Sequence, residues 1–231
     1  MKKLLDRIFI DGLGGMAQGL FATLIIGTII QQIGLFMGGG TGDLIYELGK
    51  IAAGLTGAGI GVGVARKLEA GHLVIVSAAV VGMIGAFAGK ILSGQVLVDG
   101  NLVLAGPGEP LGAFAAAYLA IEIGILISGK TKLDIILTPL VCIGTGSAVG
   151  LFVGPPISEF MLWLGSLINW GTEQQPFLMG IVVSVLMGMI LTLPISSAAL
   201  GVILNLSGLA AGAATIGCCC NMIGFAVASW R

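Results

Sequence analysis

The sequence carries very little charge. Only 9% of its 231 residues are Asp, Glu, Lys or Arg, whereas soluble domains carry about 25%. The chain therefore lacks the polar surface that a water-soluble globule needs. Its formal net charge is −1, so there is no basic field to attract nucleic acid, and we expect no nucleic-acid partner.

Side chains that do chemistry are also scarce. The one histidine, His72, lies at the edge of a basic loop, where we expect an interfacial position. The four cysteines are Cys142 and the adjacent Cys218, Cys219 and Cys220. Three adjacent cysteines point in three directions on a helix, which argues against a disulfide framework and a metal site. With no triad or paired-carboxylate pattern either, we predict no catalytic residues, metal or cofactor in this chain.

Apolar residues and glycine are abundant instead. Hydrophobic residues make up 57% of the chain, and there are 40 glycines. Small residues allow membrane helices to approach closely, and pairs such as Gly59 and Gly63 are typical of such packing. We therefore predict an all-α polytopic membrane protein, a single transport domain over 1–231, embedded in the lipid bilayer of the plasma membrane.

The predicted spans follow from the distribution of charge. A helix needs about 20 mostly apolar residues to cross the bilayer. Charge-poor stretches occur at 13–37, 48–65, 73–89, 111–128, 135–153 and 176–193. The long neutral run 174–230, which includes the last of these stretches, can hold two spans and a partial insertion, or three tight spans. Its segment 194–210 suits a re-entrant hairpin, which gives about 7–8 membrane segments in all.

The fifth predicted span is followed by "FVGPPISEFMLWLGSLINW". This stretch has two prolines and then Phe160, Trp163 and Trp170. Aromatic side chains are typical of the interface between lipid and water, so we expect a helix lying in the interface here.

The basic residues predict the orientation of the chain. With a cytoplasmic N-terminus, only Lys50 and Lys90 fall outside. Seven basic residues fall inside, namely Lys2, Lys3, Arg7, Arg66, Lys67, Lys130 and Lys132. This bias is the one that the positive-inside rule expects.

The segment "GILISGKT", residues 124–131, fits the phosphate-loop pattern G-x-x-x-x-G-K-[ST]. A phosphate loop must follow a β-strand, but the preceding "LGAFAAAYLAIEI" is helical in character. We interpret the match as a coincidence and Gly129–Asp134 as a short basic turn between two membrane helices.

Glu122 is the most informative polar residue. It lies past the midpoint of the predicted span 111–128, and Tyr118 is one turn back on the same helical face. A carboxyl group at that depth is costly and by default marks a functional pathway. The alternative is a protonated glutamic acid that hydrogen-bonds a neighbouring helix for structural reasons.

Other polar residues interrupt apolar segments. Gln18 and Gln32 share a polar stripe on the first span, where lining and packing roles are equally open. Pro194, Ser196, Ser197 and Asn205 interrupt the long neutral run. Broken helices can bind polar substrates at such positions, although an ordinary proline kink is the alternative.

Several segments resemble the membrane component, enzyme IIC, of the sugar phosphotransferase system, and the resemblance is nearest to permeases related to the fructose-type enzyme IIC. The segments that carry it are "TPLVCIGTGSAVGLFVGPPISEFMLWLGSLINW", "QPFLMGIVVSVLMGMILTLPISSAAL", "GLFATLIIGTIIQQIG", "GVGVARKL" and "GKTKLDIILTP". Where fructose-type members have Asp-Met-Gly-Gly-Pro, this chain has "LTLPISSAA", without an acidic residue. Members of this branch also continue beyond the counterpart of Arg231, so we expect a shortened or fragmentary chain.

The resemblance implies a permease that binds a small polar solute, a sugar or polyol, near the middle of the membrane. A cytosolic enzyme IIB would phosphorylate that solute, and Arg66, Lys67, Lys130 and Lys132 would face this partner. We expect Glu122, Tyr118, Gln18, Gln32, Pro194, Ser196, Ser197 and Asn205 to contact the solute. We also expect a homodimer. The alternatives are a proton- or cation-coupled carrier or channel, and a membrane regulator that transports nothing.

Overall fold

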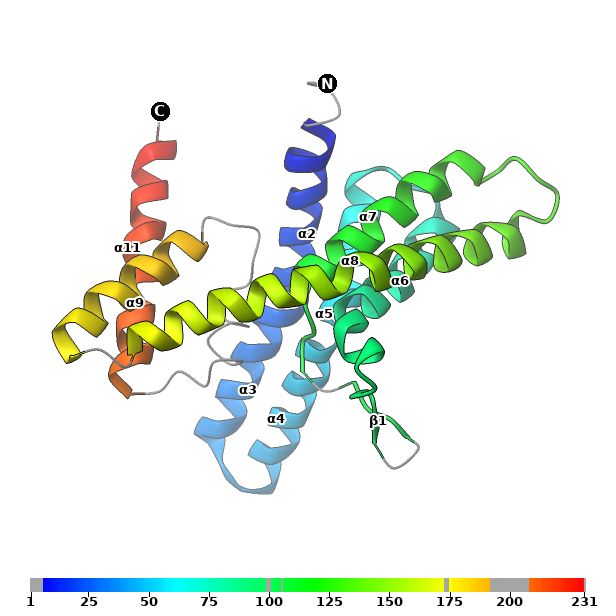
Figure 1. The fold of residues 1–231 in the computed structure, drawn as a ribbon. Coiled ribbons are helices and arrows are strands. Elements are labelled where there is room, and N and C mark those ends of the chain that lie inside the picture. The colour runs from blue at the N-terminus through cyan, green and yellow to red at the C-terminus, as the bar shows by residue number, and fades with distance from the viewer. Residues whose placement is uncertain (1–5, 99–100, 105, 173–174, 192–207, 231) are drawn as a thin grey trace. The chain divides into compact units, whose positions relative to one another are not determined.

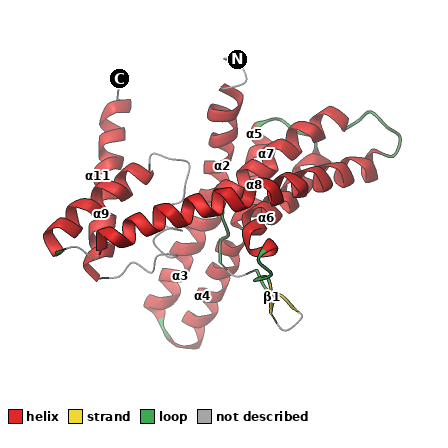
Figure 2. Cartoon of the chain, viewed as in Figure 1, coloured by secondary structure: helices red, strands yellow, loops and turns green. Residues whose placement is uncertain are grey.

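The computed structural model describes residues 6–98, 101–104, 106–172, 175–191 and 208–230 (Figure 1). Nearly all of them are helical (Figure 2), which confirms the all-α prediction. Contacts divide the chain into two compact units, Met1–Ser158 and Glu159–Arg231. Residues 194–207 of the predicted re-entrant hairpin lie outside the described residues.

The first unit contains most of the elements. Its helices, where η denotes a π-helix, are η1 (Arg7–Gly12), α2 (Leu13–Leu20), η2 (Phe21–Ile25), α3 (Ile26–Met37), α4 (Gly39–Gly54), α5 (Thr56–Lys67), α6 (His72–Leu92) and α7 (Pro110–Ile127). Between α6 and α7, strands β1 (Leu97–Val98) and β2 (Asn101–Leu102) pair antiparallel, with Leu97 opposite Leu102. Helix α8 (Asp134–Thr172) begins in this unit and contains the boundary between the two.

Five helices in the described part of the chain are long and apolar enough to cross a membrane, and a bent helix pair makes a sixth. The five are Ile10–Met37, His72–Leu92, Pro110–Ile127, Asp134–Ile157 and Gly208–Ser229. Four of them coincide within a few residues with predicted spans, because long runs without charge fix the positions of membrane helices. The chain is thus a multi-pass membrane protein.

The second predicted span, 48–65, differs from the structure. In its place stands the bent pair Gly39–Gly54 and Thr56–Lys67, with an angle of 49° between the two helices. Gly38 has φ +60° and forms the turn from α3 to α4, and α4 begins directly after it. The charges of Glu47 and Lys50, expected on the outer side of the membrane, lie on the exposed side of α4 with 3.5 Å between Oε1 and Nζ.

Glycines form the seams of the first unit. Helix α2 packs on α5, and α3 packs on α4. A Cβ atom on Gly15 would lie 2.6 Å from the carbonyl oxygen of Gly63, and one on Gly34 would lie 2.6 Å from the backbone nitrogen of Tyr46. The helix backbones therefore touch, as small residues in membrane helices permit. This confirms the packing role that the Gly59 and Gly63 spacing predicts.

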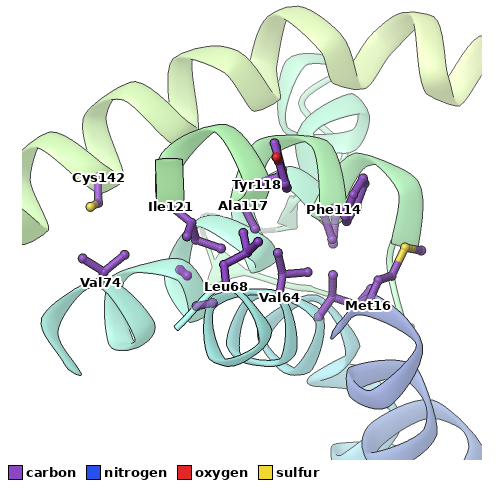
Figure 3. Close-up of a cluster of buried hydrophobic side chains, with 14 of the residues drawn as sticks. Met16, Val64, Leu68, Val74, Phe114, Ala117, Tyr118, Ile121 and Cys142 are labelled. Atoms are coloured by element: carbon purple, nitrogen blue, oxygen red, sulfur yellow. The ribbon is translucent and has the colours of Figure 1, made fainter. Parts of the chain in front are cut away.

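The core of the first unit lies where its helices converge (Figure 3). Met16 of α2, Val64 of α5, Val74 of α6, Ile121 of α7 and Cys142 of α8 are all buried there. Helix α7 consequently contacts protein along much of its length, and this arrangement fixes the positions of Tyr118 and Glu122.

Helix α8 continues past residue 153, where the fifth predicted span ends, and reaches Thr172 with Pro139, Pro155 and Pro156 inside it. The prolines do not end the helix, because proline keeps a helical φ and membrane helices tolerate its missing donor. In the second unit, α9 (Pro176–Leu191) packs against α11 (Gly208–Ser229). The Ser184 hydroxyl donates a 2.7 Å hydrogen bond to the Ala213 carbonyl between them.

Candidate functional site

The carboxylate of Glu122 is paired with Arg7. The Arg7 Nε donates a hydrogen bond of 2.6 Å to Glu122 Oε1, and its Nη2 donates one of 3.3 Å to Oε2. The two side chains are 39% and 32% exposed, respectively. Two-point contact between a guanidinium and a carboxylate fixes the orientation of both groups. From the sequence, Glu122 is an isolated carboxyl group within a span. In the structure it pairs with a cation, Arg7, which lies before the first span.

Tyr118 lies beside this ion pair. Its residue is 7% exposed, and its hydroxyl oxygen is buried. Its ring packs against Phe114 with 5.7 Å between centroids. Phe114, Tyr118 and Glu122 follow one another at i, i+4 spacing and therefore share one face of α7. The hydroxyl and the carboxylate are the types of group that hydrogen-bond a polyhydroxylated solute.

The N-terminal segment η1 covers this face of α7. A Cβ atom on Gly12 would lie 3.2 Å from the Phe114 ring and 3.3 Å from the Tyr118 ring, so the backbone of Gly12 runs directly over both rings. Ile8 of the same segment packs against the core of the first unit. The sequence did not identify Arg7, because its partner is 115 residues away. The predicted topology puts Arg7 and the end of the span that carries Glu122 on the same, cytoplasmic side, and this was the available indication that the two could meet.

The four predicted partner-facing residues lie at the same end of the first unit as this site. Arg66 and Lys67 are exposed at the end of α5, and Lys130 and Lys132 are exposed in the turn between α7 and α8. A Cβ atom on Gly71, which precedes α6, would lie 3.4 Å from the Ser128 hydroxyl, so the two loops are neighbours.

Asp134 holds the α7–α8 turn in shape. Its Oδ1 accepts hydrogen bonds of 2.9 Å from the Gly129 backbone N–H and 2.6 Å from the Thr138 hydroxyl. The resemblance to a phosphate loop has no structural counterpart, because the element that leads into Gly129 is the helix α7, which extends to Ile127, and not a strand. The pattern therefore spans a helix end and a turn, as the sequence indicates.

Gln18 and Gln32 make no described hydrogen bond with the residues of this site. Both are exposed, and neither is joined to Glu122 by a described hydrogen bond. Gln18 lines an open depression on the first span with Ala17, Phe21, Ala22 and Ile26. The segment η2 lies between the two glutamines, and a π-helix has more residues per turn than an α-helix, so one polar stripe need not continue through it. The predicted residues Pro194, Ser196, Ser197 and Asn205 lie outside the described residues.

A second carboxyl group is buried at the opposite end of α7. Glu109 immediately precedes this helix, and its backbone N–H donates a 2.7 Å hydrogen bond to the Ala86 carbonyl of α6. Its Oε1 is buried without a hydrogen-bond partner among the described residues. Burial raises the pKa of Glu109 to about 7. The sequence did not identify this group, because its burial depends on the packing of α7 against α6.

The raised pKa of Glu109 predicts that stability depends on pH. An acid whose pKa is higher in the folded state than in the unfolded state stabilises the fold at low pH, and this contribution is lost as pH rises to about 7. Between about pH 5 and pH 8, the protein should lose about 2–3 kcal/mol of unfolding free energy. Melting in detergent at both values measures this loss. Glu109→Gln should abolish most of it, and an unchanged difference in that variant would contradict the assignment.

Among the described residues, no cluster of three or more His, Cys, Asp or Glu side chains could hold a metal ion. At the site, Arg7, Tyr118 and Glu122 supply hydrogen-bonding groups and charge. Such an arrangement can bind and orient a polar solute.

Comparison with known proteins gives one result. The family model described as "Phosphotransferase system, EIIC" matches residues 10–231, which is nearly the whole chain. Comparisons with curated proteins and with solved structures found no significant match. Because the match includes the membrane helices and the site on α7, the chain belongs to the EIIC family of the phosphotransferase system, whose members are sugar permeases that work with an EIIB partner.

Proposed function

We propose that this chain moves a sugar or polyol across the plasma membrane and releases it to a cytosolic EIIB protein for phosphorylation. The observation that carries the proposal is the group of Tyr118 and Glu122 on one face of α7, within a chain of the EIIC family. A hydroxyl and a carboxylate can hydrogen-bond the hydroxyl groups of such a solute. The segments quoted above, such as "GLFATLIIGTIIQQIG" and "GKTKLDIILTP", favour the fructose-type branch of the family, whereas "LTLPISSAA" departs from the pattern of that branch.

The polar residues outside this group would form the rest of the path. Gln18 and Gln32 would contact the solute from the first span, and Pro194, Ser196, Ser197 and Asn205 are the further residues that the sequence proposes for solute contact. Amide and hydroxyl groups on membrane segments need polar partners, and a polar solute would provide them. We propose that the protein works as a homodimer.

The charges at the two ends of the first unit support a proposed orientation. Arg66, Lys67, Lys130 and Lys132 would lie on the cytoplasmic side, together with the N-terminus. In this orientation, the ion pair of Arg7 and Glu122 would lie near the cytoplasm and Glu109 near the outer surface. Exposed basic side chains can attract an acidic surface of EIIB, so replacing all four with glutamine should weaken the association without changing the fold.

A binding screen tests the proposal. The purified full-length protein is titrated with a panel of sugars and polyols, and saturable binding of at least one member is expected. Glu122→Gln should weaken that binding about tenfold, since hydrogen bonds to charged groups contribute about 1.5–3 kcal/mol. Lys50→Gln, which removes an exposed charge on α4, is the matched control and should bind normally. Absence of saturable binding to every member would favour a regulator that transports nothing.

A further inference from the structure

The two groups that we assign to the solute are both contacted by a single short segment. Glu122 is engaged by Arg7, and Tyr118 lies beneath Gly12. Both covering residues belong to η1, and Tyr118 is only 7% exposed. If these groups are to contact a solute, the segment Arg7–Gly12 must first move away from α7. This conclusion depends on the proposed function for the identity of the solute, but the covering itself is a property of the fold.

The segment is built in a way that suits movement. It is a π-helix, a rare conformation that occurs mostly as single turns within α-helices and frequently at functional sites. No side chain caps its N-terminal end. Gly14 lies two residues after it in an open position, and a glycine supplies conformational freedom for a hinge. Its polar connection to α7 is the ion pair between Arg7 and Glu122, in which both side chains are about one third exposed to solvent.

We propose that Arg7–Gly12 is a gate over a hydroxyl-binding site formed by Tyr118 and Glu122, and that the ion pair of Arg7 with Glu122 is its latch. In the closed state seen here, the guanidinium of Arg7 hydrogen-bonds both carboxylate oxygens of Glu122, and the backbone of Gly12 covers the ring of Tyr118. In the open state, the tyrosine hydroxyl and the carboxylate oxygens would be available to the hydroxyl groups of a sugar.

A change from π-helix to α-helix provides a route for opening. A π-turn contains an extra residue relative to an α-turn, so this change alters the register of everything before it by about one residue. One residue corresponds to a rise of about 1.5 Å and a rotation of about 100°. Such a displacement removes Arg7 from Glu122, because charge-assisted hydrogen bonds require donor–acceptor distances of about 2.7–2.9 Å.

Accessibility of position 118 tests the gate in the full chain. The four native cysteines are replaced with alanine, Tyr118→Cys is introduced as a reporter, and its reaction with a membrane-permeant maleimide is timed. Adding Arg7→Gln should accelerate labelling about fivefold, and Arg7→Lys should give an intermediate rate. Lys50→Gln removes a cation from a different ion pair and should leave the rate unchanged.

A second reporter separates gate opening from general loosening. Ser77 is 2% exposed on α6, and Ser77→Cys should remain slow to react in the presence of Arg7→Gln. The proposal is overturned if Arg7→Gln does not accelerate labelling at position 118, or if both reporters accelerate equally. Labelling needs no solute, so a positive result stands even where the binding screen is negative, and the gate and the proposed function fail independently.

Discussion

Replacing Gly15 with valine is expected to prevent the first unit from folding stably. A Cβ atom at this position would lie 2.6 Å from the Gly63 carbonyl oxygen and 2.7 Å from the Val64 Cα atom. Both are backbone atoms, so no rotamer change can relieve the contact, and α2 must move away from α5. Overpacking typically costs about 1–3 kcal/mol, and the rigid neighbours here favour the upper end of that range or more.

The adjacent Gly14 is a matched control for this experiment. Its Cβ atom would meet only the flexible end of Lys67, at 3.9 Å from Cε. Gly14→Ala should therefore be neutral or stabilising by up to about 1 kcal/mol, because alanine has the higher helix propensity. Yield of monodisperse protein and melting temperature in detergent measure both effects. Equal melting temperatures for Gly15→Val and Gly14→Ala would contradict the close packing of α2 on α5 at Gly15.

Reversing the charge of Arg7 should have the second large effect. Arg7→Glu places two carboxylates where the structure has a 2.6 Å ion pair. Loss of the pair alone should cost about 1 kcal/mol, because both side chains are partly exposed and solvent screens the interaction. Repulsion between the two carboxylates should bring the total to about 2 kcal/mol.

Exchange of the two residues provides the rescue. The double variant with Arg7→Glu and Glu122→Arg restores opposite charges and should recover much of the lost melting temperature. A double-mutant cycle then isolates the interaction between these two positions from other effects of each change. If the effects of the single variants simply add in the double variant, the two side chains do not interact in the folded protein.

The positions of the long helices could be predicted from the sequence, but the bend in the second span could not. Runs without charge indicate α6 and α7 directly, because lipid excludes charged side chains. The bend at Leu55 lies between apolar and small residues, and no charge marks it. Helix α4 includes Asp43 and Glu47, which indicate a loop by composition but are compatible with an exposed helical face.

The candidate site was predictable only in part. Glu122 and Tyr118 stand out in the sequence because polar groups are rare in a span. Arg7 does not, because its role depends on a contact between segments far apart in the chain. The same reason applies to Glu109, whose carboxyl is buried only once α6 and α7 pack together.

Uptake into right-side-out or reconstituted vesicles tests the central claim most directly. Labelled sugars and polyols are offered on the outer side, with EIIB and its phosphoryl donor present or absent on the cytoplasmic side. The account predicts saturable uptake that needs the donor, with the solute recovered as its phosphate ester. Uptake that proceeds equally without the donor and follows a proton or cation gradient would contradict it.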